Sequence, residues 1–171
     1  MIAANAFHIA QSSYGQYTYD PVVDGNFVPN LPGQLLLDGD FHRVEVMVGH
    51  NGEEGLPFTS QITQTDDGFE AFVLQCLPTL TADQIEYVIN VLYPSVYNGS
   101  TPYPYQNPVG RGALFVGDVV VCNTNYLNRA FNNQTYVYEF NIPPAVHGQD
   151  LVYTFYNGTP SISVTNDMLP M

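Results

Sequence analysis

Residues 44–55 read VEVMVGHNGEEG, a run rich in β-branched residues that leads into a glycine-rich turn with two glutamates. The first five residues have the apolar composition of a buried strand, and Gly49 ends it. In α/β folds, functional side chains lie in the loops that follow the carboxyl ends of strands. Glu53 and Glu54 are therefore candidate site residues, although a pair of solvated turn carboxylates fits the same pattern.

A second predicted strand is followed by a histidine. Residues 135–140 (TYVYEF) have strand composition, and the loop 143–150 (PPAVHGQD) contains His147. An acid and then a histidine, each beyond the end of a strand, is the chain order of the last two members of an α/β-hydrolase triad. The alternative is that His147 simply belongs to the polar surface.

Helical patterns fill most of the interval between the two strands. Asp67 is the expected N-cap of a helix that stops before Pro78. Thr81 and Gln84 form a capping box for a second helix, which ends at Pro94. Strands that alternate with helices in this way are typical of an α/β sheet.

Three further segments are predicted from composition. Residues 94–110 are rich in Pro, Tyr, Asn and Gly and predict a long surface loop. Residues 111–131 are compatible with a strand or a helix, and their length favours one buried helix. Residues 17–32 alternate around Asp24-Gly25, which predicts a β-hairpin.

The fold class is α/β, and residues 1–171 form a single domain. Only two convincing core strands occur, however, and two strands do not make a stable sheet with both faces covered. We therefore expect the chain to be a piece of a larger domain, truncated at both ends.

Composition excludes several classes of partner. The chain has 16 acidic residues against three arginines and no lysine, so its net charge is −13. Nucleic acids and anionic membranes need cations that this chain lacks. No apolar run is long enough to span a bilayer. The four histidines lack metal-ligand spacing, and no phosphate-binding loop occurs, so we expect no cofactor.

The sequence has features of a secreted protein. Asn98, Asn133 and Asn157 each begin an N-x-[ST] sequon and are candidate N-glycosylation sites. The first ten residues (MIAANAFHIA) nevertheless lack the charged and apolar regions of a signal peptide, so we expect that the start of the protein is missing. Cys76 and Cys122 are compatible with a disulfide or with two free thiols.

Four collinear stretches carry a specific resemblance. They are PVVDGNFVPNLP (21–32), VEVMVGHNGEEGLPF (44–58), RGALFVGDVVVCNTNYLNRAF (111–131) and TYVYEFNIPPAVHGQD (135–150). In this order they resemble the C-terminal part of type-B carboxylesterases, the cholinesterase and lipase-like family, and most of all its fungal secreted members. The resemblance implies a partial α/β-hydrolase fold and the hydrolysis of carboxylic esters by a serine acyl-enzyme mechanism.

The resemblance also implies the site residues. It places the triad acid at Glu54, with Glu53 as a neighbour outside the triad, and the triad base at His147. The family's nucleophile lies in G-x-S-x-G, and none of the seven serines here has glycine two residues before and two residues after it. The glycine-rich oxyanion loop is absent as well, so we expect the chain alone to be inactive.

Two alternatives to a catalytic role remain. The family includes non-catalytic members, so a cholinesterase-like binding module is one, and a decayed fragment without function is the other. The family substrate would be a small neutral or apolar ester, acted on outside the cell. If the hydrolase interpretation is right, strands 44–48 and 135–140 lie side by side and parallel, and Glu54 meets His147 beyond their ends.

Overall fold

The structure is a computed structural model that describes residues 2–12 and 22–155. In these residues two strands occur, β1 (Met47–Asn51) and β2 (Tyr136–Phe140). The α-helices are α1 (Ile2–Gln11), α2 (Pro32–Asp38), α3 (Asp66–Cys76), α4 (Ala82–Tyr87), α5 (Pro108–Ala130) and α6 (Leu151–Thr154). Short 3-10 turns span Leu56–Phe58 and Gln61–Gln64, and a π-helical turn continues α4 over Val88–Leu92.

The two strands pair in parallel, with Met47 opposite Tyr136 and Asn51 opposite Phe140. This confirms the predicted side-by-side arrangement, in which the segment between the strands forms the crossover. β1 nevertheless begins three residues later than the predicted 44–48. Its partner strand starts at Tyr136, whose N–H already donates to the carbonyl of Val46 (3.0 Å), so the preceding residues have no ladder to join.

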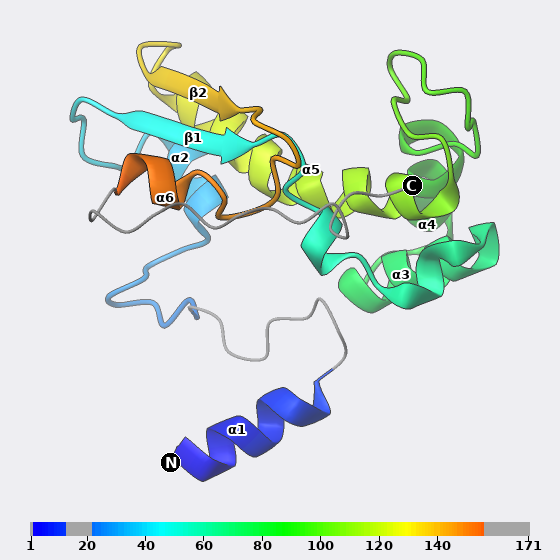
Figure 1. The fold of residues 1–171 in the computed structure, drawn as a ribbon. Coiled ribbons are helices and arrows are strands. Elements are labelled where there is room, and N and C mark those ends of the chain that lie inside the picture. Colours follow the sequence, from blue (N-terminus) through cyan, green and yellow to red (C-terminus); the bar gives the residue numbers. More distant parts are fainter. Residues whose placement is uncertain (1, 13–21, 156–171) are drawn as a thin grey trace.

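Helix α5 links two halves of the molecule (Figure 1). One end packs behind the sheet and against α2, and the other packs against α3 and the 3-10 turns. The hydrophobic core lies in this second half, where Phe115 meets the rings of Phe69, Phe72 and Tyr93 edge-on at 5.5–6.1 Å between centroids. The sequence of residues 111–131 is compatible with a strand or a helix, and the structure confirms the helix.

Arg111 is buried at the edge of this core and has a structural role. Its guanidinium pairs with Asp66 at 2.8 Å and donates to the carbonyls of Ile89 (2.7 Å) and Tyr93 (2.6 Å). It also lies 4.0 Å from the centre of the Phe69 ring. One side chain thus ties α3, the π-helical turn and α5 together.

Helix starts differ in detail from the sequence prediction. Thr65, not Asp67, caps α3, because its hydroxyl accepts the N–H of Gly68 at 3.0 Å. The capping box of Thr81 and Gln84 is confirmed at the start of α4. Helix α5 begins at Pro108 rather than 111, and most of the predicted loop before it is confirmed as irregular.

The predicted hairpin around Asp24-Gly25 is wrong for the part that the structure describes, since no strand occurs in residues 22–46. Instead, the Asp24 carboxylate accepts the backbone N–H groups of Asn26 and Val28, both at 2.9 Å. These bonds lower the pKa of Asp24 and satisfy the turn locally without a partner strand. Residues 17–21 lie outside the described residues.

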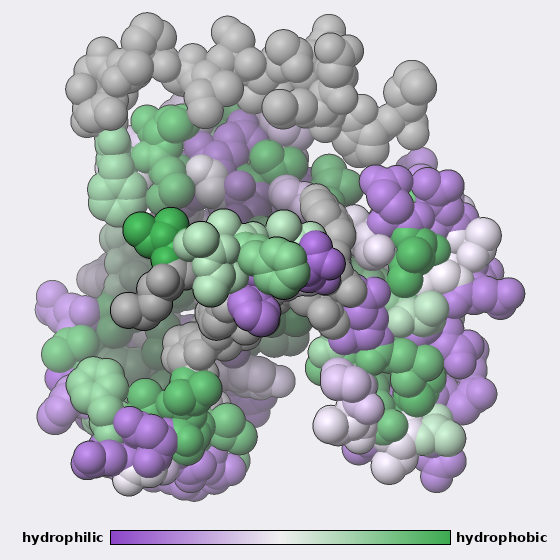
Figure 2. All heavy atoms as spheres, turned by 90° about the horizontal axis from the view of Figure 1, so that it is seen from below, coloured by the Kyte–Doolittle hydropathy of each residue, from purple (hydrophilic) through white to green (hydrophobic). Residues whose placement is uncertain are grey.

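The surface of the described chain carries many apolar side chains. On the face in Figure 2, hydrophobic residues are exposed beside hydrophilic ones. Helix α1 lies apart from the rest in Figure 1, and all its residues are exposed.

Both cysteines are free, so the disulfide alternative is not realised. Within residues 2–12 and 22–155, no helix has the length and apolar character needed to cross a membrane.

Candidate active site

The loops that follow β1 and β2 are joined by backbone hydrogen bonds. The N–H of Gly52 donates to the carbonyl of Phe140 at 3.0 Å, and that of Glu53 donates to Ala145 at 2.9 Å. A further parallel bridge pairs Glu53 with Val146. These contacts extend the strand pairing past the end of the sheet and bring the two sequence-predicted site segments together.

Glu54 is buried at this junction, with 4% of its surface exposed. Its Oε1 accepts the backbone N–H of Asn51 at 2.6 Å. Its Oε2 contacts Nδ1 of His147 in a hydrogen bond that is also an ion pair when the imidazole is protonated. The predicted contact between Glu54 and His147 is therefore confirmed.

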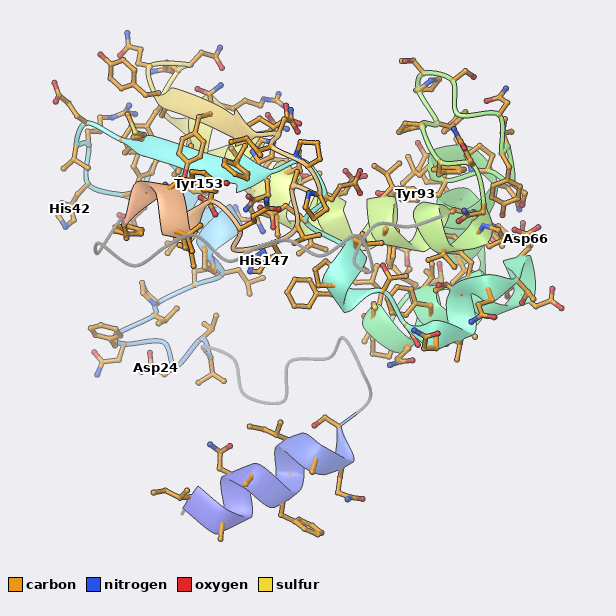
Figure 3. All side chains as sticks on the ribbon, in the orientation of Figure 1. Asp24, His42, Asp66, Tyr93, His147 and Tyr153 are labelled. Carbon is orange, nitrogen blue, oxygen red and sulfur yellow. The ribbon has the colours of Figure 1, made fainter. Side chains whose placement is uncertain are left out.

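His147 lies beyond the carboxyl end of β1, well apart from the Asp66–Tyr93 region of the core (Figure 3). Its side chain is 48% exposed, and its ring meets the edge of Phe58 at 5.0 Å. Because Nδ1 is bound to Glu54, Nε2 is the nitrogen left for a reacting group. In the described part of the chain, no hydrogen bond occupies Nε2.

Glu53 has a different environment from Glu54. Partial burial raises the pKa of its carboxyl group, and no hydrogen bond links that group to His147 among the described residues. What Glu53 contributes to the junction is its backbone, through the hydrogen bond to Ala145 and the bridge pairing with Val146. The register of the sequence motif thus agrees with the geometry, in which the second glutamate meets the histidine.

Close backbone packing fixes the turn that carries Glu54. A Cβ atom added to Gly55 would lie 1.8 Å from the carbonyl oxygen of Ala113 and 2.5 Å from the nitrogen of Gly117, both on α5. The turn therefore rests directly on the helix, and a side chain at residue 55 would force them apart. This contact fixes the position of the turn, and so of Glu54, relative to the end of the sheet.

Sequence reasoning missed three residues that surround the pair. The side-chain Nδ2 of Asn51 donates to Asp150 Oδ1 at 3.1 Å, and the Tyr138 hydroxyl donates to Asp150 Oδ2 at 2.8 Å. Partial burial acts to raise the pKa of Asp150, but these two bonds outweigh it and the pKa is lowered. Asn51 and Asp150 lie inside the two quoted motifs, which is the signal that could have found them.

The other predicted positions lie on the surface. Asn98 and Asn133 are exposed, so both sequons are accessible, whereas Asn157 lies outside the described residues. Among residues 2–12 and 22–155, no group of three or more His, Cys, Asp or Glu side chains is arranged to hold a metal ion.

Comparisons with known proteins place this geometry in context. No family model matches the chain. Carboxylesterase patB of Aspergillus clavatus is 34% identical over 157 residues, which cover 91% of this chain and 28% of the relative. A secreted triacylglycerol lipase of Gibberella zeae is 28% identical over 165 residues, which cover 84% of this chain and 28% of the lipase.

A solved structure is also similar to most of this chain. The crystal structure of Aspergillus niger EstA matches with a TM-score of 0.68 at 23% identity, over 90% of this chain and 31% of that chain. This likeness shows that the fold is a partial α/β-hydrolase fold. The chain spans less than a third of each of these three proteins. Over most of its length it is similar to one stretch of type-B carboxylesterases and lipases, as its four motifs predict.

Proposed function

We propose that this chain supplies the acid and the base of a serine ester hydrolase. In this proposal Glu54 orients His147, and His147 moves the protons of the reaction. The observation that carries it is the contact between the buried Glu54 carboxylate and Nδ1 of a half-exposed imidazole. The similarity to a carboxylesterase and a lipase supports the reaction class.

The chemistry requires both residues. Nε2 of His147 takes the proton of a serine hydroxyl as the oxygen attacks the ester carbonyl, and then gives it to the departing alcohol. Water repeats the sequence on the acyl-enzyme. The Glu54 carboxylate holds the imidazole in the tautomer with its proton on Nδ1 and stabilises the imidazolium that forms.

The nucleophile in this proposal comes from sequence other than these 171 residues, since none of the seven serines has the required glycines. The substrate is a small neutral or apolar ester, in keeping with the similarity to a carboxylesterase and a lipase. We place the complete protein outside the cell, with glycans on Asn98 and Asn133, in keeping with the secreted lipase among its relatives.

A chimera tests the proposal. The stretch of Aspergillus clavatus carboxylesterase patB that aligns with this chain is replaced by the chain itself, and hydrolysis of p-nitrophenyl butyrate is measured. We expect the chimera to hydrolyse the ester and Glu54→Gln to lower kcat by about 10⁴-fold, because the imidazole loses its orienting charge. Glu53→Gln, the matched control, changes kcat by less than about threefold, because Glu53 does not face His147.

The outcomes separate the alternatives. Equal losses in the two variants would contradict the assignment of the acid. A chimera that folds and is secreted but stays inactive would favour the binding module or the decayed fragment. The unfused 171-residue chain should show no hydrolysis above the buffer rate. Turnover by the unfused chain that disappears in His147→Ala would instead reveal a nucleophile within it.

A further inference from the structure

The amide of Asn51 lies between two carboxylates and is 3% exposed. Its backbone N–H donates to Glu54 Oε1 at 2.6 Å, and its side-chain Nδ2 lies 3.4 Å from the same oxygen and 3.1 Å from Asp150 Oδ1. We propose that Asn51, anchored by Asp150, is the positioning residue that presents Glu54 to His147. This inference rests on the proposed function, in which Glu54 orients the histidine.

The carboxylate needs such a residue because rotation about its side-chain bonds would turn it away from the imidazole. A glutamate side chain in a turn can rotate, and either oxygen, or neither, could then face the imidazole. Asn51 occupies Oε1 from two directions, through its backbone and its side chain. Only Oε2 is left for Nδ1 of His147. The imidazole orientation therefore depends on a residue that does not touch it.

The side chain of Asn51 is itself held in place by Asp150 and Tyr138. Asp150 accepts from its Nδ2, and the other oxygen of Asp150 accepts from the Tyr138 hydroxyl at 2.8 Å. The Tyr138 ring lies against the backbone of Gly49, where an added Cβ would come within 2.1 Å of it. The ring therefore has little freedom to swing. The lowered pKa of Asp150 keeps that carboxylate ionised and a strong acceptor.

Residue 51 acts here as a donor. The amide oxygen of Asn51 is buried and has no partner in the part of the chain that the structure describes, which costs stability. An apolar side chain would remove that cost but leave Oδ1 of Asp150 without its donor. An aspartate would place a third carboxylate between Glu54 and Asp150. A neutral side chain with an N–H is the type that serves both neighbours.

The tautomer of His147 tests the proposal without any need for catalysis. Nitrogen-15 NMR of the 171-residue chain distinguishes a proton on Nδ1 from one on Nε2, and His147→Gln identifies the signal. We expect the tautomer with its proton on Nδ1 to dominate and its share to fall in Asn51→Ala, because Glu54 Oε1 then keeps the backbone N–H of residue 51 but loses the side-chain Nδ2. Asn123→Ala is the matched control, an exposed amide on α5 that should leave the tautomer unchanged.

A second pair of variants guards against misfolding of Asn51→Ala. Asp150→Ala and Tyr138→Phe loosen the anchor from outside, and each should shift the tautomer in the same direction by a smaller amount, with the circular dichroism spectrum preserved. An unchanged tautomer in Asn51→Ala, or in both outer variants when Asn51→Ala does not fold, would overturn the proposal. An inactive chimera beside a shifted tautomer would count against the esterase function alone. An active chimera with an unshifted tautomer would count against Asn51 alone.

Discussion

At the scale of single residues, Arg111 shows how one side chain stabilises the helical half. It is 2% exposed, and its three nitrogens reach a carboxylate on α3 and two carbonyls on the segment 89–93. A lysine keeps the charge but is a single donor group that cannot reach three separated acceptors. We expect Arg111→Lys to lower the free energy of unfolding by about 2 kcal/mol or more.

Chemical denaturation followed by circular dichroism measures this difference. Arg129→Lys is the matched control, because Arg129 is exposed in the last turn of α5 and its substitution should change stability by less than about 0.5 kcal/mol. Equal effects of the two substitutions would contradict the structural role of Arg111.

Some residues of the site could be predicted from the sequence, and others could not. Glu54 and His147 could be selected because few side-chain types can act as acid and base, and each follows a predicted strand. For Asn51 and Asp150 the only sequence signal is their place inside the two motifs, since amides and carboxylates are common in polar turns, and nothing marks Tyr138 among the other tyrosines. Their association depends on the register of β1 against β2, which sets which side chains meet across the sheet end.

At the scale of elements, the contact between the 52–55 turn and α5 makes a sharp prediction. An alanine at residue 55 would place Cβ 1.8 Å from the backbone oxygen of Ala113, and backbone atoms of a helix cannot move aside cheaply. We expect Gly55→Ala to destabilise the chain by about 3 kcal/mol or more in thermal or chemical unfolding.

The control for this substitution is another glycine. Gly33 in α2 has nothing within 4 Å of an added Cβ, so Gly33→Ala should be neutral or stabilising by up to about 1 kcal/mol. A loss of stability at residue 33 as large as at residue 55 would contradict close packing against α5 as the cause of the loss at residue 55.

Element types could be predicted better than element boundaries. The strands, the capping box at Thr81 and the long helix follow from composition and local hydrogen-bonding groups. The start of β1 depends on where β2 begins, which local composition does not contain. The predicted hairpin at Asp24 failed because a turn sequence needs two strands that pair, and the Asp24 carboxylate satisfies the turn without them.

At the scale of the whole molecule, the open edges of the sheet favour association between copies, and the net charge opposes it. Neither strand has a second neighbour in the part of the chain that the structure describes. Met47 and Tyr136, at the start of the two strands, are 72% and 69% exposed, and Val44, just before β1, is 64% exposed. Open strand edges favour pairing between copies. The net charge of −13 holds copies apart, and salt screens that repulsion.

We therefore expect the chain to associate reversibly, and more strongly as salt rises, in sedimentation velocity experiments over a range of concentrations. Met47→Lys should weaken association at high salt, because a lysine on an edge strand blocks pairing. Ile2→Lys changes the net charge by the same amount at an apolar residue that is 88% exposed on α1, far from the sheet. By charge alone, both substitutions would reduce repulsion and favour association. Weakening by Met47→Lys but not by Ile2→Lys therefore assigns association to the sheet, and parallel responses would exclude it.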